Sequence, residues 1–191
     1  KRKMNSKKAI TLLVLATLIM SMLPLVPVKA IAPGTLSDFN VVYDQTITVD
    51  GTGVTAGATV EVYWDAVQPW DGEGGKLNSS KAKASGSWEC EIDIPEGLIG
   101  DHYIWARDIS TGDTIVFPMV TMDPSLDFDP SSGLPNDDVD VTGYGFGEEL
   151  EITDFEWYNT ITVAWEPITL SPSSPDTDEL GTWTGSWDVP S

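Results

Sequence analysis

Residues 86–95 read GSWECEIDIP and residues 181–190 read GTWTGSWDVP, and these two similar stretches indicate the fold most clearly. Apolar and acidic side chains alternate through the first stretch, and the apolar ones are Trp88, Cys90, Ile92 and Ile94. Alternation with a period of two places such a set on one face of a β-strand. Pro95 is expected to end the strand, because proline cannot donate a ladder hydrogen bond. The corresponding set in the second stretch is Trp183, Gly185, Trp187 and Val189. Cys90, the sole cysteine, is therefore predicted to be a buried core residue without a partner thiol.

A second pair of stretches matches in the same order along the chain. Residues 49–54 read VDGTGV and residues 141–146 read VTGYGF, an offset of 92 residues, whereas the first pair is offset by 95. Two matches in one order and at nearly one spacing indicate an internal repeat. The glycines of the second pair are interpreted as residues that adopt positive φ at a turn or bulge; they are Gly51, Gly53, Gly143 and Gly145.

Short strands account for the rest of the chain after Ala30. Apolar and polar residues alternate over short stretches separated by Gly, Pro, Asn and Asp, and no ten-residue stretch has helical periodicity. The predicted strands are residues 38–43, 46–50, 59–64, 87–94, 102–107, 114–122, 125–128, 138–142, 149–155, 160–165 and 182–189. With no helix to cover a parallel sheet, the predicted fold class is all-β, with antiparallel β-sandwiches in tandem.

The repeat divides the chain into two predicted domains. Residues 31–122 form the first sandwich and residues 123–191 the second. The first repeat continues past its IDIP sequence with two further predicted strands, whereas the second stops at Ser191, just after WDVP. We therefore expect the second repeat to be truncated, because half a sandwich would expose sheet edges.

Residues 1–30 differ from the rest and are predicted to be a signal peptide. Lys7 and Lys8 precede an apolar run from Ala9 to Leu23, and small residues stand at Val28 and Ala30, the −3 and −1 positions of a cleavage site. Cleavage is expected after Ala30. The alternative is an uncleaved anchor, but the run of about fifteen residues is shorter than a bilayer span. The mature chain is thus expected to have no membrane span and to be secreted or exposed at the cell surface.

The charge of the chain excludes two classes of partner. Its formal net charge is −20, and six of the ten basic residues but none of the thirty acidic ones lie in residues 1–30. The remaining four basic and thirty acidic residues give residues 31–191 a net charge of −26. Such a field repels a phosphate backbone and anionic lipid, so nucleic acid and the membrane surface are not expected as partners.

Residues 126–146, LDFDPSSGLPNDDVDVTGYGF, and the closing stretch of residues 181–190 carry a family resemblance. They resemble the tandem immunoglobulin-like repeats, of the IPT/TIG-like kind, in cell-surface and surface-layer proteins of archaea and bacteria. The first repeat fits in part, since it has no Pro-Ser-Ser-Gly and has Val54 where the second has Phe146. The resemblance implies immunoglobulin-like sandwiches and a role in surface structure or cell adhesion. It does not imply a reaction.

Six aspartates near the boundary between the repeats are candidate metal ligands: Asp123, Asp127, Asp129, Asp137, Asp138 and Asp140. Hard carboxylate oxygens suit Ca²⁺, and a bound ion would stiffen the boundary and relieve the repulsion among the carboxylates. The alternative is a solvated acidic linker, because Asp is also common in turns. Calcium is therefore a candidate ligand, and no cofactor is expected to be required.

Two further residues are candidate sites. Trp70 stands in the glycine-rich stretch WDGEGG and is expected to be exposed, where an indole can stack on a sugar ring. Asn78 begins an Asn-Ser-Ser sequon in a predicted polar loop and is a candidate glycosylation site. No catalytic residue is predicted, because His102 is the sole histidine and lies in a predicted strand.

These observations predict a secreted or cell-surface protein with a structural or adhesive, non-catalytic role. Its expected partners are other surface proteins or glycans. The alternative is that the repeats are the carbohydrate-binding region of a larger secreted enzyme.

Overall fold

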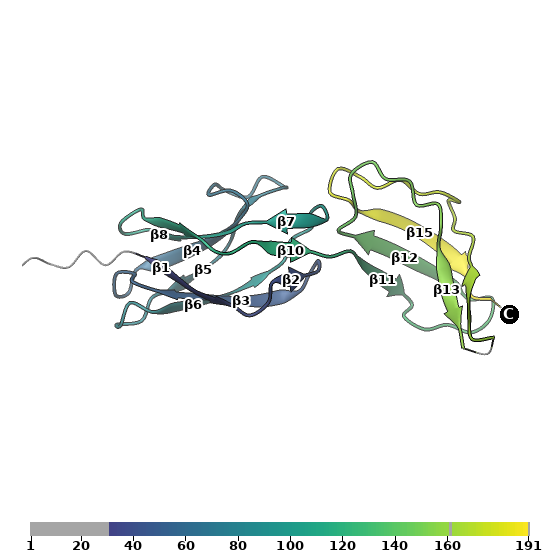
Figure 1. Cartoon of the computed structure of the whole chain (residues 1–191), viewed down its shortest axis with the longest axis horizontal. Helices are drawn as coiled ribbons and strands as arrows, with labels where there is room; N and C mark the ends of the chain where they lie inside the picture. Colours follow the sequence, from purple (N-terminus) through teal and green to yellow (C-terminus); the bar gives the residue numbers. More distant parts are fainter. Residues whose placement is uncertain (1–30, 161, 191) are drawn as a thin grey trace, which may run out of the picture.

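The computed structural model describes residues 31–160 and 162–190, so the predicted signal peptide lies outside the described residues. Every regular element in the described part is a β-strand, and all strand pairs are antiparallel except β2 with β10. Figure 1 shows two lobes placed end to end, the first unit up to β10 and the second unit from β11. The all-β, antiparallel prediction is confirmed. No helix of the described residues is long and apolar enough to cross a membrane.

The first unit packs sheets around one core. One sheet has the order β1-β3-β6, the second β5-β4-β8-β9, and a small third sheet β2-β10-β7. The strands are β1 (Ala32–Leu36), β2 (Asn40–Val41), β3 (Thr46–Thr52), β4 (Thr59–Trp64), β5 (Gly75–Lys81), β6 (Trp88–Asp93), β7 (Gly100–His102), β8 (Ile104–Asp108), β9 (Thr114–Val116) and β10 (Val120–Met122).

The core of the first unit follows from the alternation in its sequence. The predicted inward set of β6 and the residue after it is buried: Trp88, Cys90, Ile92 and Ile94. From the facing sheet, Val60, Val62 and Ile104 are fully buried in the same cluster. Burial of each such aliphatic side chain stabilises the fold by about 1.5–3 kcal/mol relative to exposure. Cys90 is a free, buried thiol, as expected.

The glycines of the repeated stretches are needed for two different structural reasons. Gly53 and Gly145 have φ values of 84° and 72°, as predicted for turn glycines. Gly51 and Gly143 do not, and the prediction was wrong for them. Gly51 pairs across the sheet with Trp88, and a Cβ there would lie 2.7 Å from the indole nitrogen of Trp88. Gly143 pairs with Trp183 in the same way, so each glycine makes room for an indole.

The second unit has a strand order that corresponds to part of the first. Its three-stranded sheet, β11-β12-β15, matches β1-β3-β6, and its hairpin β13-β14 matches the hairpin β4-β5. Its described residues contain no strand that corresponds to β8 or β9. The strands are β11 (Ser125–Asp129), β12 (Asp138–Tyr144), β13 (Glu156–Asn159), β14 (Ala164–Pro167) and β15 (Trp183–Asp188).

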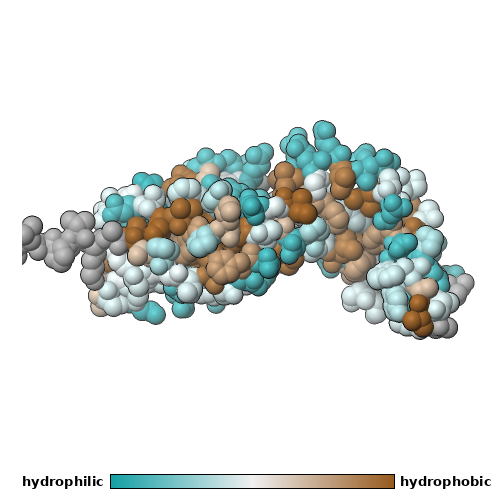
Figure 2. All heavy atoms as spheres, viewed as in Figure 1, coloured by the Kyte–Doolittle hydropathy of each residue, from teal (hydrophilic) through white to brown (hydrophobic). Residues whose placement is uncertain are grey.

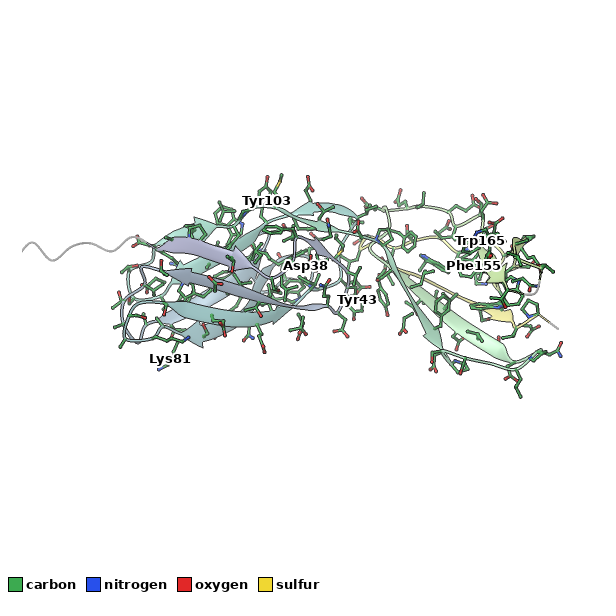
Figure 3. All side chains as sticks on the ribbon, turned by 60° about the horizontal axis from the view of Figure 1, so that its bottom comes forward. Asp38, Tyr43, Lys81, Tyr103, Phe155 and Trp165 are labelled. Carbon is green, nitrogen blue, oxygen red and sulfur yellow. The ribbon has the colours of Figure 1, made fainter. Side chains whose placement is uncertain are left out.

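Aromatic rings dominate the smaller core of the second unit. Trp183 is buried with Val141 and Leu170, and the ring of Phe155 lies 5.8 Å from that of Trp183 and 5.7 Å from that of Trp187. Phe155, which is labelled in Figure 3, packs against this core. Apolar side chains reach the surface among hydrophilic ones over both units in Figure 2.

Candidate functional site

The joint between the two units is short and packed. Only Asp123 and Pro124 separate β10 from β11. Tyr43, which lies at the end of the first unit in Figure 3, stacks on Tyr144 with ring centroids 4.1 Å apart and planes 28° apart. Gly145 lies so near the connection that a Cβ would be 3.2 Å from the Asp123 carbonyl oxygen. The chain therefore crosses between the units with little free length.

The loop of residues 95–99, between β6 and β7, provides the other contacts at the joint. The backbone N–H of Ile99 donates to the Phe146 carbonyl at 3.2 Å. The Thr182 hydroxyl donates to the Glu96 carboxylate. This loop thus contacts the second unit at two of its five residues.

His102 holds the same loop from inside the first unit. Its ring stacks on Trp64 at 4.6 Å between centroids, and its side chain is 13% exposed. Nδ1 lies 2.7 Å from Oδ2 of Asp65, and Nε2 lies 2.8 Å from the Leu98 carbonyl oxygen. Asp65, at a φ of 54°, also accepts from the Tyr103 N–H at 2.7 Å. The imidazole therefore bridges the end of β4 and the loop of residues 95–99.

The partners of His102 favour its charged form. A carboxylate and a carbonyl are both acceptors, so both contacts are hydrogen bonds only when both ring nitrogens carry a proton. Burial acts to lower the pKa of His102, but the hydrogen bonds to Asp65 and Leu98 and the charges of Asp65 and Asp101 outweigh it, and the pKa is raised. With both nitrogens engaged, the ring has no free lone pair for general-base chemistry.

A cleft of about 300 Å³ opens beside His102 between the units. Apart from the imidazole of His102, the charged side chains that line this cleft are carboxylates. They are Asp65 and Glu73 from the first unit and Glu148 and Glu179 from the second. Among residues 31–160 and 162–190, no group of three or more His, Cys, Asp or Glu side chains is placed to hold a metal ion.

The structure does not bring the six predicted calcium ligands together. β11 runs away from the joint and β12 returns to it, so Asp123 lies at the joint while Asp129 pairs with Asp140 near the far end of the two strands. Asp127 faces Thr142, and Asp138 pairs with Asp188. Asp137 accepts a hydrogen bond from the Leu134 N–H. A calcium site at this boundary stays a prediction from the sequence.

The two other predicted sites are exposed. Trp70 lies in the loop between β4 and β5 and is 41% exposed. Asn78 lies on β5 rather than in a loop, where its amide donates to the Glu91 carbonyl at 2.7 Å. The strand was missed because Lys, Asn and Ser dominate its sequence and strand-forming residues do not.

The second unit carries an apolar cleft that the sequence did not reveal. It has a volume of about 380 Å³, and its aromatic walls come from Phe128, Trp157 and Trp187. On the other face of the hairpin, Tyr158 and Trp165 pair across the strands with centroids 5.3 Å apart. They are 45% and 64% exposed, and Trp165 is labelled in Figure 3.

Comparison with known proteins adds little to this geometry. No protein-family model and no curated protein matches the chain. Among solved structures the chain is similar to macromomycin, with 20% sequence identity and a TM-score of 0.37, over 48% of this chain and 100% of that one. At this level the similarity carries no argument about fold family or function.

Proposed function

We propose that the chain is a structural or adhesive, non-catalytic part of an exported or cell-surface protein, in which two β-sandwich units in series form one stiff arm. The observation that carries the proposal is the joint, with its two-residue connection, stacked tyrosines and loop contacts. The engagement of both His102 nitrogens supports a non-catalytic role. The net charge of −26 over residues 31–191 supports an extracellular setting without nucleic acid.

We also propose that both units are immunoglobulin-like repeats of the IPT/TIG kind. The matching strand orders β1-β3-β6 and β11-β12-β15 support this, together with the Gly–Trp pairs Gly51–Trp88 and Gly143–Trp183 at equivalent positions. The expected partners are other surface proteins or glycans.

Small-angle X-ray scattering of the chain from Ile31, with the full chain measured in parallel, tests the stiff arm. We expect a narrow, elongated distance distribution that broadens when Gly-Ser-Gly-Ser is inserted between Asp123 and Pro124. A matched insertion after Gly112, in the exposed turn between β8 and β9, should leave the distribution unchanged. Equal, broad distributions for the parent and the Asp123 insertion would contradict the proposal.

Glycan binding is a second candidate function, and the pair Tyr158 and Trp165 is the observation that favours it. Exposed rings on one hairpin face can stack on sugar rings, as can Trp70. A glycan array should then show hits that are lost in Trp165→Ala or Trp70→Ala. They should persist in Phe39→Ala, which removes a similarly exposed ring from the first unit. An array without hits would exclude this candidate.

A further inference from the structure

The loop of residues 95–99 connects two sets of contacts that are otherwise separate. On its inner side the Leu98 carbonyl accepts from the His102 ring. On its outer side Glu96 and Ile99 contact Thr182 and Phe146 of the second unit. Any change in how His102 holds Leu98 is therefore transmitted, over one or two residues, to the groups that fix the second unit.

Deprotonation of His102 must break one of its two contacts. A neutral imidazole carries a single N–H, so it cannot donate to both Asp65 and Leu98. The carboxylate is the stronger acceptor, and a proton retained on Nδ1 keeps the bond to Asp65. Nε2 then presents a lone pair to the Leu98 carbonyl oxygen 2.8 Å away, and two acceptors at that distance repel.

Among the described residues, those that line the cleft beside His102 include no Lys or Arg. Asp65 follows β4, Asp101 lies on β7, and Glu73 comes from the loop before β5. The second unit contributes Glu148 and Glu179 to the same cleft. Two uncharged side chains also lie here: Trp64 stacks on the ring, and a Cβ at the adjoining Gly97 would lie 3.7 Å from the sulfur of Met122 on β10. All the charged groups that face the ring therefore favour its protonated form.

We propose that His102 is a pH-sensitive clasp for the joint: when protonated it fixes the loop of residues 95–99 and holds the units as one body, and when neutral it releases the loop and lets the units move separately. This inference rests on the proposed stiff arm. Because the pKa of His102 is raised above its ordinary value of 6.5, the joint should be stiff below about pH 6.5 and should loosen as the pH rises through the pKa of the ring in the folded protein.

Nuclear magnetic resonance can test the clasp on one sample. His102 is the sole histidine, so the ring titration needs no assignment. Backbone ¹⁵N relaxation gives a rotational correlation time for each unit, measured from about pH 5.5 to about pH 9.5 on the chain from Ile31 and on the full chain. We expect the two correlation times to agree at low pH and to differ at high pH. The midpoint of this change should coincide with the midpoint of the ring titration.

Two variants separate the clasp from general effects of pH. Asp65→Asn keeps an oxygen acceptor but removes the charge, so both midpoints should move down together by about one pH unit or more. His102→Gln should make the correlation times independent of pH. If that variant does not fold, the parent and Asp65→Asn still decide the question.

Each outcome decides between the proposals. Coincident midpoints that move together in Asp65→Asn support the clasp. A ring that titrates while the correlation times stay equal overturns the clasp and leaves the stiff arm standing. A joint that loosens with another midpoint, unmoved by Asp65→Asn, also overturns it. Separate correlation times at every pH overturn both proposals.

Discussion

Gly143 and Trp183 illustrate how a single residue fits this fold. They are cross-strand partners on β12 and β15, and a side chain at Gly143 would overlap the indole of Trp183 and approach the ring of Phe146. The sequence repeat indicated that this glycine matters, but the predicted reason, a positive φ, was wrong. A glycine that makes room for an indole and a glycine at positive φ look alike in a sequence, and only the register of the strands distinguishes them.

The substitution Gly143→Ala should destabilise the second unit by about 1–3 kcal/mol, because a methyl group in filled space forces the indole or the strand to shift. Urea unfolding followed by tryptophan fluorescence measures this. Gly147→Ala is the matched control, since nothing lies within 4 Å of the position of its Cβ. Equal stability of the two variants would refute the packing explanation.

Among the strands and their loops, Asp108 anchors the end of β8 through hydrogen bonds that its carboxylate accepts from two loops. Its buried carboxylate accepts from the Thr55 N–H at 3.1 Å and from the N–H and hydroxyl of Ser110, each at 2.7 Å. Burial acts to raise the pKa of Asp108, but these hydrogen bonds outweigh it and lower the pKa below its ordinary value. The carboxylate thereby ties the loop between β3 and β4 to the turn between β8 and β9.

A folded-state pKa that is lower than the unfolded one stabilises the protein above about pH 4, and this contribution is lost as the pH falls through the folded value. Asp108→Asn should therefore lower the free energy of unfolding at neutral pH by about 1–3 kcal/mol. The difference from the parent should shrink in acid. Asp113→Asn, at an exposed position of the same turn, is the control and should change little. A constant difference between parent and Asp108→Asn from neutral pH to pH 3 would contradict this role.

Strands with strong alternation were predictable, and strands without it were not. The predicted strand at residues 59–64 coincides with β4, and those at residues 87–94 and 182–189 exceed β6 and β15 by one residue at each end. Residues 149–155 also alternate, yet they form no strand and only an isolated bridge from Glu151 to Asp176. Alternation reports which side chains can share a face, and tertiary pairing decides whether a ladder forms.

At the scale of the whole molecule, the candidate site depends on contacts between distant residues. Asp65 and His102 are 37 residues apart, and Glu96 and Thr182 are 86 apart. No local pattern marks such pairs, so the sequence identified His102 only as a lone histidine in a strand. The aspartates suggested a site at the joint by their proximity in sequence, but two antiparallel strands carry most of them away from it.

The negative charge of the chain should weaken the fold through self-repulsion. Raising NaCl from about 20 mM to about 500 mM at neutral pH should therefore raise the melting temperature of the chain from Ile31 by a few degrees, because the added salt shortens the Debye length. Differential scanning calorimetry measures the effect. Near pH 4 the carboxylates are partly protonated and the effect should shrink. An equal rise in melting temperature at both pH values would show that salt does not act by screening the repulsion between carboxylates.

The two units should behave as one stiff body while His102 is protonated. Residual dipolar couplings measured at about pH 6 on the chain from Ile31 test it most directly, since each unit reports its own alignment. The couplings of residues 31–122 and those of residues 123–160 and 162–190 should fit one alignment tensor calculated on this structure. Two tensors of different magnitude or orientation would contradict it.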